Sequence, residues 1–152
     1  INLGLVAAVY HWPTLLRLAE VHNAAKKDPF SRARGWDELG RQLAPLVAAH
    51  PGAVVVAENR TLLAHMIYEL RAVAPPAASW NPQGLKTDHY KLSTDLRPYR
   101  GGDVLFLTQD SLAVEVAARF RTAAPLATLE APLDETHALT VKVYLLREFQ
   151  GY

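Results

Sequence analysis

A run of five small or β-branched apolar residues stands in the middle of the chain, AVVVA at positions 53–57. No polar residue alternates within it, which is typical of a strand buried on both faces in a parallel sheet covered by helices. A Pro-Gly pair at 51–52 precedes the run, and a helical pattern begins directly after the polar tip Glu58-Asn59-Arg60. A strand that leads straight into a helix is the repeating unit of α/β domains. Ligands in such domains usually lie beyond the carboxyl ends of the strands, which is where this tip falls.

The segments on either side extend the same pattern. Apolar residues recur at helical spacing from Trp36 onward and again at about 60–72. Three more strands are predicted at 77–80, 103–108 and 126–130, with a helix beginning at Asp110 or Ser111 and carrying Phe120. Residues 140–147 alternate, which predicts an antiparallel edge strand, and residues 81–102 form a long loop of the kind that is often functional. The predicted fold is a three-layer, Rossmann-like α/β domain with a mainly parallel sheet, one antiparallel edge strand and an N-terminal helix.

Composition excludes several classes of function. A net charge of +1 gives no electrostatic argument for nucleic-acid binding, and the absence of cysteine excludes disulfides, iron–sulfur clusters and thiolate zinc sites. The six histidines never occur at a spacing that places two ligands on one helix face, so no metal site is predicted. The turn after the central strand has no glycine, and neither a P-loop nor a GxSxG motif is present. No cofactor is therefore expected, and no catalytic residue can be assigned.

The N-terminal segment is unusual because no charged side chain occurs before Arg17. Its apolar run is shorter than the roughly 20 residues that cross a bilayer. It could be the end of a truncated membrane helix, with Tyr10 and Trp12 at the interface, or a core-packing amphipathic helix. The following connector, residues 26–34, is basic and is either a solvated linker or a contact for lipid headgroups. We divide the chain at this connector into an N-terminal segment, residues 1–27, and a soluble α/β domain, residues 28–152.

Polar and aromatic side chains follow the predicted strands. Asn59 and Arg60 follow the central strand, and Trp80 and Asn81 follow the next one. If these strands are parallel, the four residues converge on one rim, where Arg60 could bind an anionic group and Trp80 could stack on a sugar-like ring. Simpler explanations remain open, since Asn59 is also a good helix N-cap and a tryptophan is more often part of a core.

An ordered set of short motifs spans nearly the whole chain. It comprises DP at 28–29, RGWDEL at 34–39, AENR at 57–60, SWNPQG at 79–84, DHY at 88–90, RGGDVLF at 100–106 and YLLREFQGY at 144–152. Together these motifs resemble the region after the last membrane helix in bacterial family 39 glycosyltransferases. That family is similar to dolichyl-phosphate-mannose protein mannosyltransferases and to the lipid A aminoarabinose transferase. The loop at 88–91 departs from the pattern, because relatives often carry NQYD there and only Tyr90 is kept.

The resemblance implies a bundle of transmembrane helices followed by a soluble domain on the periplasmic side of the bacterial inner membrane, so residues 1–27 would be the end of a membrane-proximal helix. Such enzymes transfer a sugar from a polyprenyl-phosphate carrier to a lipid or protein acceptor, and their catalytic acid lies in a part of the polypeptide that precedes this segment. The expected partners are the transmembrane portion of the same polypeptide, the lipid-linked donor, the acceptor and the membrane surface. The domain would aid acceptor recognition through the rim, with Tyr90 added, and would be inactive alone. A free-standing small-molecule-binding domain and a structural or assembly domain are the alternatives.

Overall fold

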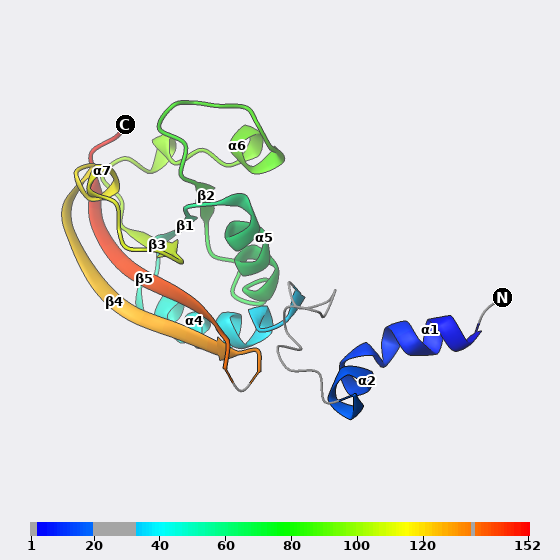
Figure 1. Cartoon of the computed structure of the whole chain (residues 1–152). Coiled ribbons are helices and arrows are strands. Elements are labelled where there is room, and N and C mark those ends of the chain that lie inside the picture. The colour runs from blue at the N-terminus through cyan, green and yellow to red at the C-terminus, as the bar shows by residue number, and fades with distance from the viewer. Residues whose placement is uncertain (1–2, 20–32, 135) are drawn as a thin grey trace. The chain divides into compact units, whose positions relative to one another are not determined.

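The computed structural model describes residues 3–19, 33–134 and 136–152 (Figure 1). It divides into two compact units: residues 1–35 with 132–139, and residues 36–131 with 140–152. Each unit is described by itself. The domain boundary expected at residues 27–28 and most of the basic connector at 26–34 lie outside the described residues.

The N-terminal segment forms two short helices, α1 (Leu3–Tyr10) and α2 (Trp12–Leu18). Pro13 stands at the start of α2, where a missing N–H costs no helical hydrogen bond. None of the residues of α1 is buried. Among the described residues, no helix has the length and apolar character needed to span a bilayer.

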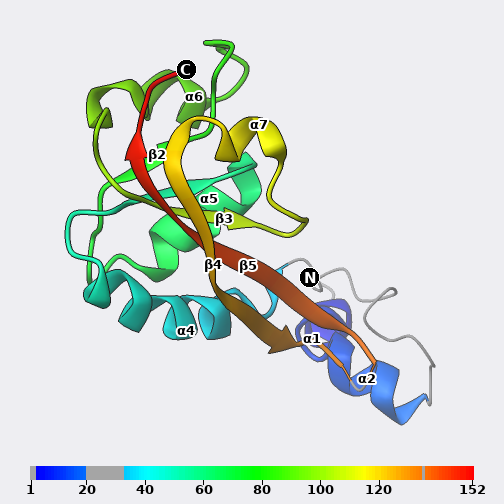
Figure 2. The ribbon, with the colours of Figure 1, turned by 90° about the vertical axis from the view of Figure 1, so that its left-hand side faces the viewer.

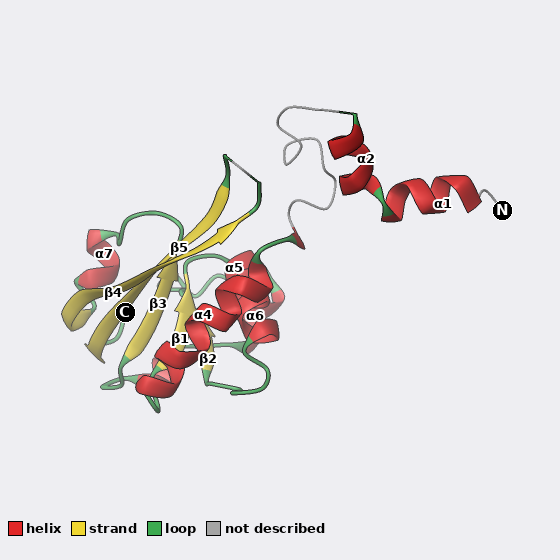
Figure 3. Ribbon diagram, turned by 90° about the horizontal axis from the view of Figure 1, so that it is seen from below, coloured by secondary structure: helices red, strands yellow, loops and turns green. Residues whose placement is uncertain are grey.

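The larger unit is built on a five-stranded sheet with the order β2-β1-β3-β5-β4 (Figure 3). The strands are β1 (Val54–Ala57), β2 (Ala77–Ser79), β3 (Val104–Thr108), β4 (Phe120–Pro132) and β5 (Ala138–Phe149). β1 pairs in parallel with β2 and with β3, whereas β3 pairs antiparallel with β5. β4 and β5 are neighbours joined by a short turn, which only an antiparallel pair allows.

This topology contradicts the predicted Rossmann-like class. β4 and β5 have 13 and 12 residues, whereas the three parallel strands have 4, 3 and 5, so most strand residues lie in the antiparallel half of a mixed sheet. Figure 2 shows this long hairpin running past the short strands. The prediction of a mainly parallel sheet was wrong because β4 and β5 are joined by a short turn. Without a crossover helix between them, the two strands can pair only antiparallel.

The alternating segment was also misplaced within the sheet. β5 lies between β3 and β4, so the predicted edge strand is an interior strand, and β4 is the edge. Apolar and polar residues alternate in β5 because its two faces are covered unequally along its length. The alternation does not indicate an edge position, since β5 has a neighbouring strand on each side. The predicted helix after Asp110 shrinks to α7 (Val114–Ala117), and Phe120 belongs to β4.

Two helices pack side by side along the parallel strands, α4 (Trp36–Ala49) and α5 (Arg60–Glu69). α4 continues through the exposed Pro45. The helices approach closely at Gly40, where an added Cβ would overlap Glu69 Cβ. At the other end of their contact, the rings of Trp36 and His65 stack 4.1 Å apart at an angle of 2°. Burial of the imidazole lowers the pKa of His65.

α4 also reaches the edge of the sheet. The Gln42 side chain donates to the carbonyl of Glu130 at 2.9 Å and accepts from the N–H of the same residue at 3.2 Å. Both backbone groups of one β4 residue are therefore occupied by a side-chain amide. This amide takes the place that a further strand would otherwise fill.

Alternate residues of the sheet meet a second apolar cluster that contains no residue of α4 or α5. Its strand members come from all five strands, and two residues outside the strands cover them: Leu96, which precedes η2 (Arg97–Tyr99), and Val116 of α7. The remaining buried members are Val54, Val56, Ala78, Val104, Phe106, Phe120, Leu146 and Phe149. The predicted loop at 81–102 contributes here too, because it contains α6 (His89–Ser93) and the 3₁₀ turn η2 (Arg97–Tyr99).

Candidate functional site

The three parallel strands end at the same edge of the sheet. Ala57 lies in register with Ser79 on β2 and with Leu107 on β3. The residues that follow each strand therefore lie at the same edge of the sheet. We call this set the strand-end rim: Glu58, Asn59, Arg60, Trp80, Asn81, Thr108, Gln109 and Asp110.

The carboxylate of Glu58 ties the ends of β1 and β3 together. One oxygen accepts a hydrogen bond from the Thr108 hydroxyl, and the other accepts from the N–H of Gln109 at 3.0 Å. Thr108 is only 1% exposed, and its hydroxyl also accepts from the N–H of Asp110 at 3.0 Å. Glu58 is thus the central acceptor of the rim. The sequence placed it at the strand tip but gave no reason to prefer it over its neighbours, since its partner is 50 residues away.

Asn59 and Arg60 lie at the start of α5. Asn59 is the N-cap, as predicted, since its side-chain oxygen accepts from the N–H of Leu62 at 3.0 Å. Its amide nitrogen lies 3.4 Å from Glu58 Oε1, so both ends of the side chain are engaged. Arg60 is exposed and makes no hydrogen bond or ion pair within the described part of the chain. A cation in the first turn opposes the helix dipole, so helix stability does not explain this arginine.

Trp80 is half-buried and packs on the second apolar cluster. Its ring meets Phe106 edge-on at 5.9 Å and Tyr152 edge-on at 5.1 Å, and it stacks against Phe120 at 6.3 Å. The ring therefore closes the end of the core at the tip of β2. Only its remaining exposed part can face a ligand.

Asn81 shapes the loop that leaves β2. Its side chain donates to the carbonyl of Leu85 at 2.8 Å and accepts from the N–H of Leu85 at 2.9 Å. Its own N–H donates to the phenol oxygen of Tyr152 at 3.0 Å. Burial raises the pKa of that phenol, and the guanidinium of Arg97 lies 5.6 Å above the ring. The last residue of the sequence thus holds the loop in place.

Tyr90 lies in α6, next to the end of β2. Its carbonyl accepts from the Thr94 hydroxyl at 2.6 Å and from the Ser79 hydroxyl at 3.4 Å, which fastens α6 to the strand. Its ring meets His89 edge-on at 5.7 Å. Asp88 caps α6 by accepting from the N–H of Lys91, and this hydrogen bond lowers the pKa of the Asp88 carboxyl. The acid of this cluster is therefore used as a helix cap.

The five predicted residues lie at the ends of β1 and β2 and in α6, which packs beside β2. The side chains of Asn59 and Asn81 form hydrogen bonds with the nearby backbone. The guanidinium of Arg60 has no such partner among the described residues. Within the described ranges, no three His, Asp or Glu side chains gather to hold a metal ion. Chemically, the rim can bind polar or anionic groups through hydrogen bonds and the guanidinium.

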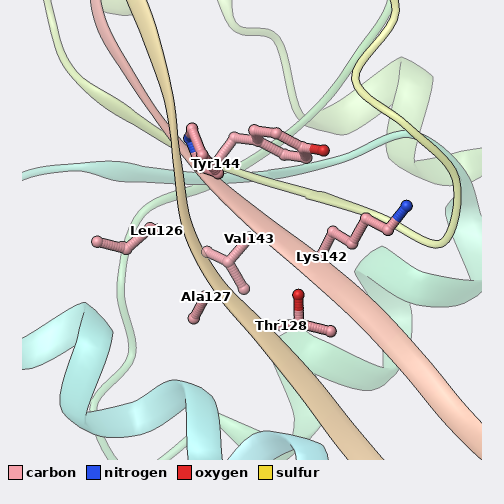
Figure 4. Close-up of a pocket in the computed structure, with 7 residues that line it drawn as sticks. Leu126, Ala127, Thr128, Lys142, Val143 and Tyr144 are labelled. Carbon is pink, nitrogen blue, oxygen red and sulfur yellow. The ribbon is translucent and has the colours of Figure 1, made fainter.

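A hollow of about 200 Å³ lies on the β4–β5 hairpin, and Lys142 in its lining pairs with the rim residue Thr108 (Figure 4). Its polar lining includes Lys142, Tyr144 and Thr128. None of these three residues was predicted to belong to a site. The alternation of β5 identified which side chains share a face, but not that β4 would run beside them.

Comparisons with protein-family models, curated proteins and solved structures find no match to this chain.

Proposed function

We propose that this chain is the periplasmic, carboxyl-terminal domain of an integral-membrane glycosyltransferase that uses a polyprenyl-phosphate-linked sugar. The ordered motifs from RGWDEL to YLLREFQGY support the enzyme class by resemblance. The domain serves acceptor recognition, because catalysis belongs to the membrane portion of the same polypeptide. The acceptor is a lipid or a protein.

The single observation that carries the membrane part of this proposal is the exposed apolar surface of α1 and α2. Leu3 is 77% exposed, Tyr10 is 81% and Leu18 is 77%, although side chains of this kind are usually covered. Transfer of each large apolar side chain from water to a lipid environment is worth about 1.5–3 kcal/mol. Four further apolar residues of the two helices are exposed: Leu5, Val6, Val9 and Leu15. A bilayer is a natural environment for such a segment, with Tyr10 at the level of the headgroups.

Acceptor recognition is assigned to the strand-end rim. Arg60 offers a charged donor with no competing partner among the described residues, and Glu58 offers a positioned carboxylate beside it. A phosphate or carboxylate group on an acceptor could pair with the guanidinium. Hydroxyl groups could bond to Glu58.

Fractionation of the native source with an antibody to this domain tests the membrane part. We expect a band several-fold heavier than 16.8 kDa that leaves the membrane only with detergent. A soluble band near 16.8 kDa would refute the proposal. It would favour the free-standing binding domain, for which the hollow on the hairpin is the first place to look.

The rim is tested in the full-length enzyme with lipid-linked sugars, by comparing Arg60→Gln with the control Arg119→Gln. Arg60 and Arg119 are both exposed, and the two substitutions change the charge equally. Arg60→Gln should raise the KM for the acceptor about fivefold to tenfold, as expected for one charge-assisted contact, without changing the KM for the donor. Trp80 is unsuitable as a first variant because its truncation would open the core. Equal kinetics for the two arginine variants would exclude the rim from acceptor recognition.

A further inference from the structure

A row of polar residues crosses one face of the sheet at the end of the parallel strands. In the β3–β5 register, Thr108 pairs with Lys142 and Phe106 pairs with Tyr144. Paired residues of antiparallel strands project to the same face, so Lys142 continues the row that begins with Glu58 and Thr108. The neighbouring row of this face is apolar, with Val56 beside Phe106. The polar row therefore marks where the apolar cluster ends and where a ligand can approach.

Lys142 is the one cation of this row, and its charge is not neutralised by the protein. It is half-buried and forms no ion pair or hydrogen bond among the residues that the structure describes. Glu58, the carboxylate of the same row, already accepts hydrogen bonds from Thr108 and Gln109. The ammonium group of Lys142 is therefore free to pair with an external anion.

The hollow beside Lys142 has both a polar and an apolar lining. In Figure 4, Lys142 and Tyr144 extend to one side of β5, whereas Leu126 and Ala127 lie on the other side of β4. Pro125 and Val143 add to the apolar part, and the Thr128 hydroxyl to the polar part. Its volume of about 200 Å³ is below the roughly 300–1,000 Å³ of pockets for drug-sized ligands. The occupant is therefore a small molecule with a charged end and a compact apolar end.

We infer that this hollow is a binding site for a small organic anion, a phosphate or carboxylate carried on a compact apolar or aromatic group. Lys142 pairs with the anion, and the hydroxyl groups of Tyr144 and Thr128 donate hydrogen bonds to it. Leu126 contacts the apolar end. The anion is supplied either by a molecule free in solution or by a lipid headgroup.

The first test is a titration of the whole ¹⁵N-labelled chain with phenyl phosphate, followed by amide chemical shifts. We expect saturable shifts centred on residues 125–128 and 142–144, with weaker binding of phenol and of inorganic phosphate alone. Lys142→Gln should weaken binding of phenyl phosphate about fivefold, Lys142→Arg should retain it, and Tyr144→Phe should weaken it about twofold. The matched control is Lys86→Gln, which removes an exposed lysine from the loop after β2. Unfolding curves of all variants exclude loss of structure as the cause.

The second test distinguishes the source of the anion. Vesicles of phosphatidylglycerol and of phosphatidylcholine are sedimented with the wild-type chain and with Lys142→Gln. Binding to phosphatidylglycerol that depends on Lys142 would assign the anion to a headgroup, and saturation by phenyl phosphate alone would assign it to a soluble molecule. The inference is overturned if phenyl phosphate produces only linear shifts up to 20 mM and Lys142→Gln leaves vesicle binding unchanged. It is equally overturned if Lys142→Gln binds phenyl phosphate as the wild type does.

Discussion

Gly40 is the position where a single methyl group should disturb the larger unit most informatively. An added Cβ would overlap Glu69 Cβ and would lie 3.6 Å from Glu69 Cα, so the obstacle is fixed to the backbone of α5. Ordinary carbon contacts need about 3.5–4.0 Å, so α4 and α5 must separate by roughly 1 Å. A gap of that size removes about a quarter to a half of the dispersion energy of each contact across it.

Helix propensity alone would make Gly40→Ala stabilising, whereas we expect this substitution to be destabilising. Gly→Ala inside a helix gains about 1 kcal/mol, whereas overpacking costs about 1–3 kcal/mol. Because the separation affects the whole α4–α5 contact, we expect Gly40→Ala to lower the free energy of unfolding by about 1–2 kcal/mol. This corresponds to a fall in Tm of about 3–8 °C. Ala48→Gly, on the exposed side of α4, is the control and should show the propensity term alone, a loss of about 1 kcal/mol.

Urea unfolding, followed by far-UV circular dichroism, measures these changes, and a double-mutant cycle identifies their cause. Glu69→Gly removes the obstructing Cβ, so in the Gly40→Ala background it should restore stability. The coupling energy between the two sites should then be at least about 1 kcal/mol. If Gly40→Ala is as stable as the wild type, or if the two substitutions are additive, the close approach of the helices is refuted.

Three further predictions follow from the contacts described above. Burial lowers the pKa of His65, so the folded state binds fewer protons than the unfolded state. The free energy of unfolding should therefore fall as the pH drops below the ordinary histidine pKa of about 6.5. The fluorescence of Trp36, which stacks on His65, should fall over the same pH range. His65→Gln should abolish both changes, and their persistence would contradict the assignment. Tyr152→Phe should cost about 0.5–1.5 kcal/mol and speed hydrogen exchange at Asn81; unchanged exchange there would contradict the contact. Burial raises the pKa of the Tyr152 phenol. The stability that this phenol contributes should therefore be present below the ordinary tyrosine pKa of about 10 and be lost as the pH rises through the raised value. Spectrophotometric titration of the wild type and of Tyr152→Phe measures this pKa. Glu58→Ala should lower the free energy of unfolding by about 1–3 kcal/mol, because the buried Thr108 hydroxyl loses its acceptor. Glu58→Gln should cost less, since its amide oxygen can still accept this hydrogen bond. Equal stabilities of the two variants would argue against the hydrogen bond between Glu58 and Thr108.

Local patterns predicted the short elements well. The apolar runs around Val55 and Leu105 became β1 and β3, and the alanine-rich segment before Trp80 became β2. These runs are buried on both faces, so their composition alone marks them as strands. The N-cap Asn59 was likewise identifiable, because capping depends on neighbours three residues away.

Features set by distant partners were not predictable in this way. The length of β4 depends on pairing with β5, and its segment from Arg121 to Pro125 is exposed and carries no apolar pattern. At the rim, the importance of Glu58 arises from Thr108, and Asn81 is fixed by Tyr152 at the end of the sequence. The availability of Arg60 could be proposed from its position, and a core role for Trp80 was one of the two explanations left open, but its ring partners Phe106 and Phe120 could not be predicted.

The amide of Gln42 has a consequence for how copies of this protein behave when concentrated. The outer side of β4 is the longest unpaired row of backbone donors and acceptors in the sheet, and such rows recruit strands from other molecules into growing fibres. Gln42 occupies both backbone groups of Glu130. A strand from another molecule would have to displace this amide before it could pair with β4, which favours a sheet of five strands over polymerisation.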